Sequence, residues 1–292
     1  MRVTQSMLSN NMLRNLSSSY ERLSKYQDQI STGKKVNRPS DDPVVVMKGI
    51  SYRTDLSEVQ QYKRNFSEAY NWIENTDAAL DNAGQALQRI RELVVEASND
   101  TYDASQRQAI SAEIKQLRDH LAEVANTKFG DKYLFNGANT TKKPVDLQAN
   151  SGDGSFPEAT QPVEIELSKG IYLPVNVPGE KVFGEQLFSD LKALTDDLDQ
   201  GKNPASYLDQ IDQHIDAINN ARADLGARQN RLEMMESRVD NQEVIATKVL
   251  SDNEDVDYEK AITDLTAQES VHRAALAVGA RVLQPTLMDF LT

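Results

Sequence analysis

The sequence predicts a mainly α-helical protein, in which both chain ends form a long antiparallel coiled-coil-like helical rod around a small β-rich insertion. Three observations predict this fold. From Val59 to Ala97, apolar or small residues recur at alternating steps of three and four. From Ile211 to Ala246, they recur at every seventh position. Such spacing keeps one stripe of a helix against a partner helix. Between these two regions, glycine, proline and β-branched residues concentrate, and the helical period is lost.

The composition supports helix seams rather than a large globular core. Of the 292 residues 39% are hydrophobic, yet only 6% are aromatic. The net charge of −13 argues against a nucleic-acid partner, since a phosphate backbone would be repelled. The absence of cysteine excludes disulfides, thiolate metal sites and a cysteine nucleophile. Every apolar run is far shorter than the ~20 residues that cross a bilayer, so we expect no membrane insertion.

The N-terminal half predicts three helices. The first covers about Gln5 to Thr32 and ends at Gly33, because glycine readily adopts a left-handed cap. Asp42 is predicted to cap a long helix that starts at Pro43 and frays near residues 98–100. A third helix is expected over about Ala104 to Lys128. The predicted seam of the first helix is Leu13, Leu16, Tyr20, Leu23, Gln27 and Ile30.

The middle and the C-terminal half predict two strands followed by three helices. Val163–Leu167 and Ile171–Val177 are the clearest strands, and the nearby prolines suggest strand ends. Helices are expected over about residues 185–200, over 205–250, and from about 258 to Pro285, with a polar turn at 251–257. The order is palindromic, which antiparallel pairing of the two ends explains. Two unrelated coiled coils joined by a β domain would give the same pattern.

This pattern predicts three domains. Residues 1–40 with 255–292 would form a terminal helical domain, and 41–136 with 185–254 a rod domain. Residues 137–184 would form an outward β-rich domain. The residues expected to pack along the rod are Phe66, Ile73, Leu80, Leu87, Val94, Ile218, Leu225 and Leu232.

Motifs for catalysis or metal binding do not emerge. His120, His214 and His272 are far apart in the chain, and neither a His-Glu-x-x-His nor a Gly-x-Ser-x-Gly motif occurs. Residues 151–155 suggest a surface turn, and the acidic run 252–259 suggests a helix-start cap. We therefore expect no catalytic residue, no cofactor and no bound metal, and predict that the protein is not an enzyme.

Several blocks resemble the bacterial flagellin family. Ile30–Pro43 (ISTGKKVNRPSDDP) is similar to the N-terminal turn of flagellins. Residues 75–80 (NTDAAL) and 87–99 resemble the flagellin core helix, and 106–117 the helix after it. The end, with Pro285 and Asp289-Phe290-Leu291, resembles family members of the hook–filament junction more than filament subunits. A filament-forming subunit is the nearest alternative, and an adhesin that uses the central β region is a more distant one.

The resemblance implies a structural subunit of the flagellum. It implies self-association in a helical or ring layer, contact with a neighbouring hook-associated junction protein and with filament flagellin, and an export chaperone that binds the C-terminal helix. It also implies an extracellular location reached without a cleaved signal peptide, and residues 1–30 indeed lack a continuous apolar core. Subunit and terminal packing would use Leu13, Leu16, Leu23, Ile30, Leu276, Leu283, Leu287 and Phe290. Arg89 and Glu92 are candidates for axial contacts between subunits.

Overall fold

A computed structural model describes residues 5–99, 103–147 and 161–282. The chain divides into two compact units. Unit 1 comprises Met1–Glu58 and Gln242–Thr292, and unit 2 comprises Val59–Asn241. The helices α2 and α6 each contribute residues to both units.

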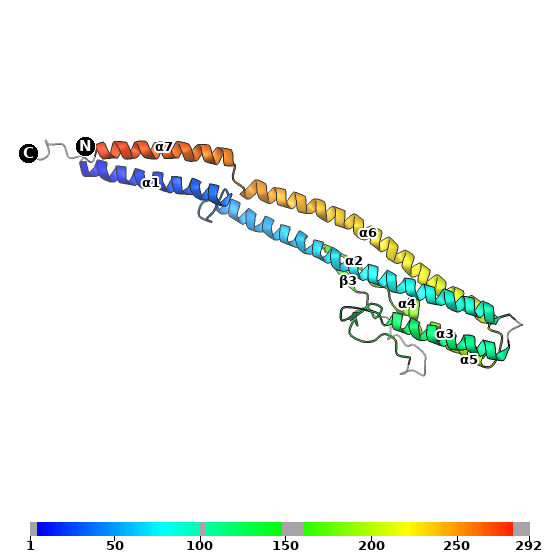
Figure 1. Ribbon diagram of the computed structural model, residues 1–292. Coiled ribbons are helices and arrows are strands. Elements are labelled where there is room, and N and C mark those ends of the chain that lie inside the picture. The colour runs from blue at the N-terminus through cyan, green and yellow to red at the C-terminus, as the bar shows by residue number, and fades with distance from the viewer. Residues whose placement is uncertain (1–4, 100–102, 148–160, 283–292) are drawn as a thin grey trace, which may run out of the picture. The chain divides into compact units, whose positions relative to one another are not determined.

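The described elements are mostly helices, as predicted (Figure 1). In chain order they are α1 (Gln5–Thr32), α2 (Pro43–Ala97), α3 (Ala104–Ala125), β1 (Lys128–Phe129), β2 (Lys132–Tyr133), β3 (Glu164–Ser168), β4 (Ile171–Pro174), α4 (Glu180–Phe183), α5 (Glu185–Asp199), a 3-10 turn (Ala205–Tyr207), α6 (Leu208–Glu254) and α7 (Tyr258–Val282).

Local chemistry sets several helix ends. Gly33 ends α1 with a φ of 70°, a conformation that residues with a Cβ disfavour. The Asp42 carboxylate accepts bonds from the backbone N–H groups of Val44 and Val45 at 3.0 and 3.1 Å, which caps α2 as expected. Asp103 and Gln106 form a reciprocal capping box at the start of α3.

Several elements differ from the sequence prediction. The second predicted strand ends at Pro174 instead of Val177, the predicted helix from residue 205 begins at Leu208 after a 3-10 turn, and β1 and β2 were not predicted. The helix α3 stops at Ala125 instead of continuing to Lys128, because the Asn126 side chain bonds Ala122 O and Val145 O instead of facing solvent. The helix α6 continues through residues 251–254, where a polar turn was predicted. The short helix α4 was not predicted, since its four residues are too few to show a period.

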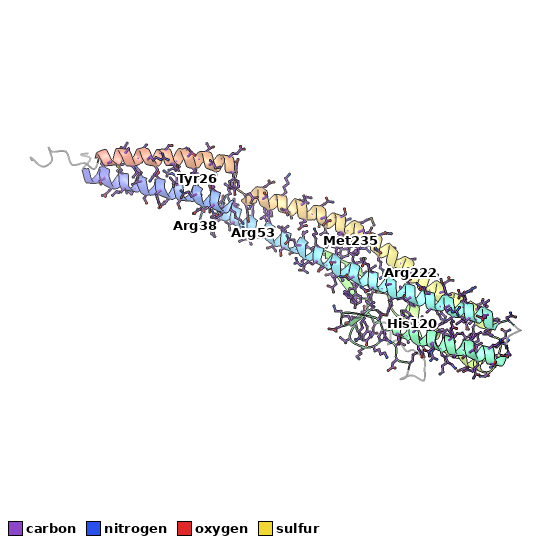
Figure 2. The ribbon with its side chains drawn as sticks, viewed as in Figure 1. Tyr26, Arg38, Arg53, His120, Arg222 and Met235 are labelled. Carbon is purple, nitrogen blue, oxygen red and sulfur yellow. The ribbon has the colours of Figure 1, made fainter. Side chains whose placement is uncertain are left out.

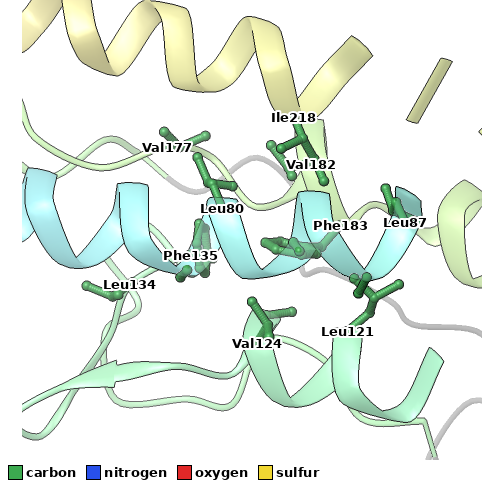
Figure 3. Packing of buried hydrophobic residues seen from close by; sticks show 14 of the residues in the cluster. Leu80, Leu87, Leu121, Val124, Leu134, Phe135, Val177, Val182, Phe183 and Ile218 are labelled. Atoms are coloured by element: carbon green, nitrogen blue, oxygen red, sulfur yellow. The ribbon is translucent and has the colours of Figure 1, made fainter. Parts of the chain in front are cut away.

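Unit 2 has one hydrophobic core (Figure 3). The stripe of α2 packs against α6, and α3 packs on α5. Phe135 and Phe183 meet edge to face at 4.9 Å between ring centroids, which joins the segment after β2 to α4. Residues from all of these elements therefore share one core.

The central β region belongs to that core. Strands β3 and β4 pair antiparallel around a turn at Gly170, whose φ is 74°. Leu167, Leu173 and Val177 are buried in the same cluster as the helices. Arg228 of α6 donates to the carbonyl oxygens of Pro174 and Asn176 at 3.1 and 2.9 Å. The division into three domains stays a prediction.

Unit 1 contains α1 and α7, the first and last helices of the described residues. Helices α1 and α7 run antiparallel, side by side (Figure 1). The predicted pairing of the two chain ends is confirmed.

Candidate functional site

Exposed apolar residues gather in unit 1. Of the 18 large hydrophobic residues that are exposed in the described part of the chain, 15 lie in unit 1. Conversely, Ala261 is the one buried hydrophobic residue of unit 1 within the described ranges. The exposed set in unit 1 is Met7, Leu8, Leu13, Tyr20, Val44, Met47, Ile50, Val244, Ile245, Val249, Tyr258, Ile262, Val271, Leu276 and Val278. Where exposed apolar residues form a contiguous surface, they often mark contacts with other molecules.

The seam between α1 and α7 is unusually polar. Ser19 of α1 is 2% exposed, and it faces α7. The Gln268 side chain donates to Ser19 Oγ at 2.9 Å, and His272 Nδ1 lies 3.3 Å from the same oxygen. Near the chain ends, Gly279 leaves room for the Met12 side chain, because a Cβ at 279 would overlap it. Polar and small residues therefore contribute to this pair, beside partly buried apolar residues such as Met12 and Leu16.

The predicted contact residues of the terminal helices take two kinds of position. Leu13 and Leu276 are exposed, at 54% and 47%. Leu16, Leu23 and Ile30 are half-buried. Leu283, Leu287 and Phe290 lie outside the described residues. Tyr20, which was predicted in the seam, is exposed, because Ser19 occupies the seam position beside it.

A second set of outward apolar residues lies on α2 and α6. Val44, Met47 and Ile50 follow one side of α2 in steps of three residues. Val45, Gly49 and Arg53 lie on the other side, toward Asn253 and Glu254 of α6. On α6, the residues Val244, Ile245 and Val249 are likewise exposed. Sequence analysis missed this surface, because three apolar residues within seven are too few to define a period.

The eight residues predicted to pack along the rod are all buried in unit 2. Each is at most 1% exposed. Polar pairs flank them: Arg222 of α6 bonds Asp77 at 2.9 Å and Asp81 at 2.7 Å on α2 (Figure 2). The hydrogen bond from Arg222 to Asp77 raises the pKa of the guanidinium. Burial raises the pKa of the Tyr70 phenol, and its bond to Glu236 raises it further.

Arg89 and Glu92 are both on the surface of α2. Arg89 bonds Glu113 of α3 at 2.9 Å and Glu92 at 3.2 Å. The pKa of Arg89 is raised first by its bond to Glu113. The Glu92 side chain is 69% exposed. Arg89 thus links α2 to α3, and the role of both residues in contacts between subunits stays a prediction.

The three histidines are separate, and each has an ordinary polar partner. His214 Nε2 lies 2.9 Å from Asp190 Oδ2, and His272 contacts Ser19. His120 lies 3.9 Å from Glu123. The described residues contain no group of side chains arranged to hold a metal ion. None of the described helices has the length and apolar character to cross a membrane.

Comparison with known proteins accounts for this arrangement of paired terminal helices. Residues 3–140 match the bacterial flagellin N-terminal helical region, and residues 208–291 match the bacterial flagellin C-terminal helical region. The chain belongs to the bacterial flagellin family. The members of this family are structural proteins of the flagellum rather than enzymes.

Relatives of two kinds align over most of the chain. Flagellin of Halalkalibacterium halodurans is 26% identical over 94% of this chain and 93% of its own length. Flagellar hook-associated protein 3 of Escherichia coli is 27% identical over 93% of both. Among solved structures, the hook-associated protein-3 of Legionella pneumophila has a TM-score of 0.63 at 16% identity, covering 69% of this chain and 97% of that one. FlgL of Bacillus cereus has a TM-score of 0.59 at 23% identity, covering 69% and 99%. These structures share the fold.

Proposed function

We propose that this chain is a structural subunit of the junction between hook and filament of the bacterial flagellum, and that it acts by assembly alone. The similarity to hook-associated protein 3 over nearly the whole length supports this function. The junction-like residues near the C-terminus, Pro285 and 289–291, support it as well. The location would be extracellular, at the hook–filament junction, reached by export without a cleaved signal peptide.

The observation that carries the proposal is the outward apolar surface of unit 1. Each exposed leucine, isoleucine or valine would contribute roughly 1.5–3 kcal/mol if a neighbour buried it fully. The surface is built from α1, α7 and the adjoining ends of α2 and α6. Neighbouring copies, the adjacent hook-associated junction protein and filament flagellin are the partners that we assign to it. Leu13 and Leu276 are the contact residues that we expect to matter most in the described part.

The geometry of α2 and α6 supports a head-to-tail layer of copies. The apolar residues of both helices are exposed, and those of α2 lie opposite its contacts with Asn253 and Glu254 of α6. If the Val44–Ile50 face of one copy meets the Val244–Val249 face of the next, each copy has two neighbours. Such a heterologous contact generates a ring or a helical layer rather than a closed dimer.

Engineered cysteines test this arrangement, since the natural chain has none. We expect a Met47→Cys/Ile245→Cys variant to form a ladder of covalent oligomers under mild oxidation, read on a denaturing gel. Either single variant should give dimers at most. A Val95→Cys/Met234→Cys variant is the matched control, because both residues are exposed on the same two helices in unit 2. Efficient dimers of Met47→Cys alone would contradict the head-to-tail contact.

Motility tests the location. Expression of the chain in a strain that lacks its own junction protein should restore swimming, and a Leu13→Glu/Leu276→Glu variant should not, because two charges would have to be desolvated. Normal swimming of that double variant would contradict the role of the terminal helices.

A filament-forming subunit is the second candidate. The flagellin of Halalkalibacterium halodurans, with 26% identity over 94% of this chain, favours it. The two candidates differ in polymer length. Expressed in place of a native filament protein, a junction subunit should not grow long filaments, whereas a flagellin should, and electron microscopy separates the two results.

An adhesin role of the central region is the third and weakest candidate. Deleting residues 137–184 would not test it, since Leu167, Leu173 and Val177 are part of the core. Substituting the 52% exposed Tyr172 by serine changes the surface of the hairpin alone. Adhesion lost while motility persists would favour this role.

A flagellar export chaperone is the partner that we assign to the C-terminal helix before assembly. The exposed residues Val271, Leu276 and Val278 of α7 give it an apolar surface to bind. A Val271→Asp/Val278→Asp variant should lose co-purification with the chaperone. Retained binding would place the chaperone site elsewhere.

A further inference from the structure

In unit 1, the break between α1 and α2 lies beside the break between α6 and α7. The helix α1 ends at Thr32 and α6 ends at Glu254. The N–H of Val256 donates to Gly33 O at 2.9 Å, and the N–H of Lys35 donates to Glu254 O at 2.6 Å. An antiparallel bridge between Lys34 and Asp255 lies between these bonds. The α1–α2 connector and the α6–α7 turn are therefore joined through their backbones.

The Glu254 carboxylate lies at the centre of this junction between connectors. Its Oε2 atom accepts from Lys34 Nζ at 2.9 Å and from Arg53 Nη2 at 2.6 Å. Glu254 is 8% exposed, and it is the one charged residue that is buried in the described part of the chain. It thus binds one cation from the connector and one from α2 (Figure 2 labels Arg53).

The surroundings of Glu254 are shaped to receive it. A Cβ at position 49 would overlap Glu254 Oε1, so the glycine of α2 leaves the space that the carboxylate occupies. The neighbouring Asn253 donates to Val45 O on α2 at 3.0 Å. Burial alone would raise the pKa of Glu254, but the hydrogen bonds from Arg53 and Lys34 outweigh it and hold the pKa below its usual range. The carboxylate is therefore ionised at neutral pH.

We propose that Glu254 is a positioning residue that couples the two helix breaks, so that α1 and α7 become ordered as one pair rather than singly. Without this link, only backbone bonds would join the ten-residue connector to the three-residue turn, and only the seam would hold α1 on α7. The inference rests on the proposed function, in which the outer faces of the α1–α7 pair are an assembly surface. A surface made from two helices exists only when both are held together.

Glu254→Gln tests the coupling, with Glu259→Gln as the matched control. Glutamine keeps the shape but removes the charge, and Glu259 is exposed in the first turn of α7. In hydrogen exchange of the purified full chain, Glu254→Gln should raise the exchange of α1, of α7 and of both connectors by about tenfold or more. Exchange in α3 and α5 should not change, nor should the fluorescence of Trp72, which is 1% exposed in unit 2. Glu259→Gln should have no effect.

A dependence on pH separates positioning by charge from simple packing. Because the pKa of folded Glu254 is lowered, its contribution is complete above the unfolded pKa and is lost as the pH falls through the folded one. The ionisable groups that bond the Glu254 carboxylate are Lys34 and Arg53. The neighbouring carboxylates of the turn, Asp255 and Asp257, are present in both the wild type and Glu254→Gln, so the comparison isolates Glu254. After correction for intrinsic exchange, protection of Lys35 and Val256 should fall on acidification in the wild type, but not in Glu254→Gln. Lys34→Met should raise exchange less, and should add little to Glu254→Gln.

Four results would overturn the proposal. The first two are an effect of Glu254→Gln no larger than that of Glu259→Gln, and faster exchange in only one of the two terminal helices. The other two are a pH dependence that persists without the carboxylate, and unprotected α1 and α7 in the wild type. Failure of the proposed function would look different. The exchange results would then hold, while the wild-type chain would fail to restore motility.

Discussion

The two units of this protein differ in which side chains they bury: unit 2 buries large apolar residues, and unit 1 leaves most of them exposed. The helix α2 shows both situations. In unit 2, Ile73 of α2 is 1% exposed and lies in a continuous core. In unit 1, Ile50 of the same helix is 57% exposed. The seam between α1 and α7 instead contains Ser19, Gln268 and His272. Unit 2 thus buries its apolar stripe within the single chain, whereas unit 1 leaves most of its large apolar residues exposed.

The largest expected difference in stability is between truncation of a buried leucine in unit 2 and truncation of an exposed leucine in unit 1. Leu80→Ala removes a fully buried side chain of unit 2 and should lower the free energy of unfolding by about 2–5 kcal/mol. Leu13→Ala removes an exposed side chain of unit 1 and should change it by less than about 0.5 kcal/mol. Urea unfolding followed by Trp72 fluorescence measures the first, and circular dichroism of the full helix content measures the second. Equal losses would remove the distinction between the units.

An intermediate effect is expected from glycine replacements. Gly33→Ala forces an alanine to a φ of 70° and should destabilise unit 1 by about 1–2 kcal/mol. Gly226→Ala, on the exposed side of α6 in unit 2 with free space around its Cβ, should stabilise by about 0.5–1 kcal/mol. Thermal melts of both variants compare them. A neutral Gly33→Ala would show that the end of α1 does not depend on the left-handed residue.

The smallest effect concerns the cap of α3 in unit 2. Asp103→Ala removes the capping box and should lower the melting temperature by roughly 2–4 °C at neutral pH. The bond from the Gln106 backbone lowers the pKa of Asp103, so its stabilisation is present above the unfolded pKa and lost as the pH falls through the folded one. The two proteins should therefore melt more alike in acid. A difference that grows on acidification would exclude the carboxylate as the cause.

Sequence patterns predicted unit 2 better than unit 1, for a physical reason. The stripe from Phe66 to Val94 is apolar at every turn, and a repeated apolar stripe has one favourable way to be buried. The seam of α1 could not be found in this way, because Ser19 occupies a buried position while Leu13 and Tyr20 are exposed. An apolar stripe marks a seam only where the apolar residues face the partner helix, and in α1 several of them face outward.

The site was predictable only in part for the same reason. The terminal helices were expected to carry the contacts, since the resemblance to flagellins implied it. The outer faces of α2 and α6 and the role of Glu254 depend on contacts between residues 200 positions apart, such as Arg53 with Glu254. The extension of α6 through residues 251–254 also depends on residues far away in the sequence. Its last residue, Glu254, bonds Lys34 and Arg53.

The α1–α2 connector also determines how the chain meets a protease. Lys34 and Lys35 place two trypsin sites in this stretch, outside any helix, whereas Pro39 protects the bond after Arg38. The boundary between the units at residues 58 and 59 falls inside α2. Helical backbone must unwind before it fits a protease, so the first cut within unit 1 should fall in this connector rather than at the unit boundary inside α2. Cleavage of Lys34 requires its ammonium to leave Glu254, so nicking at this bond would report how often the salt bridge opens in subunits awaiting incorporation.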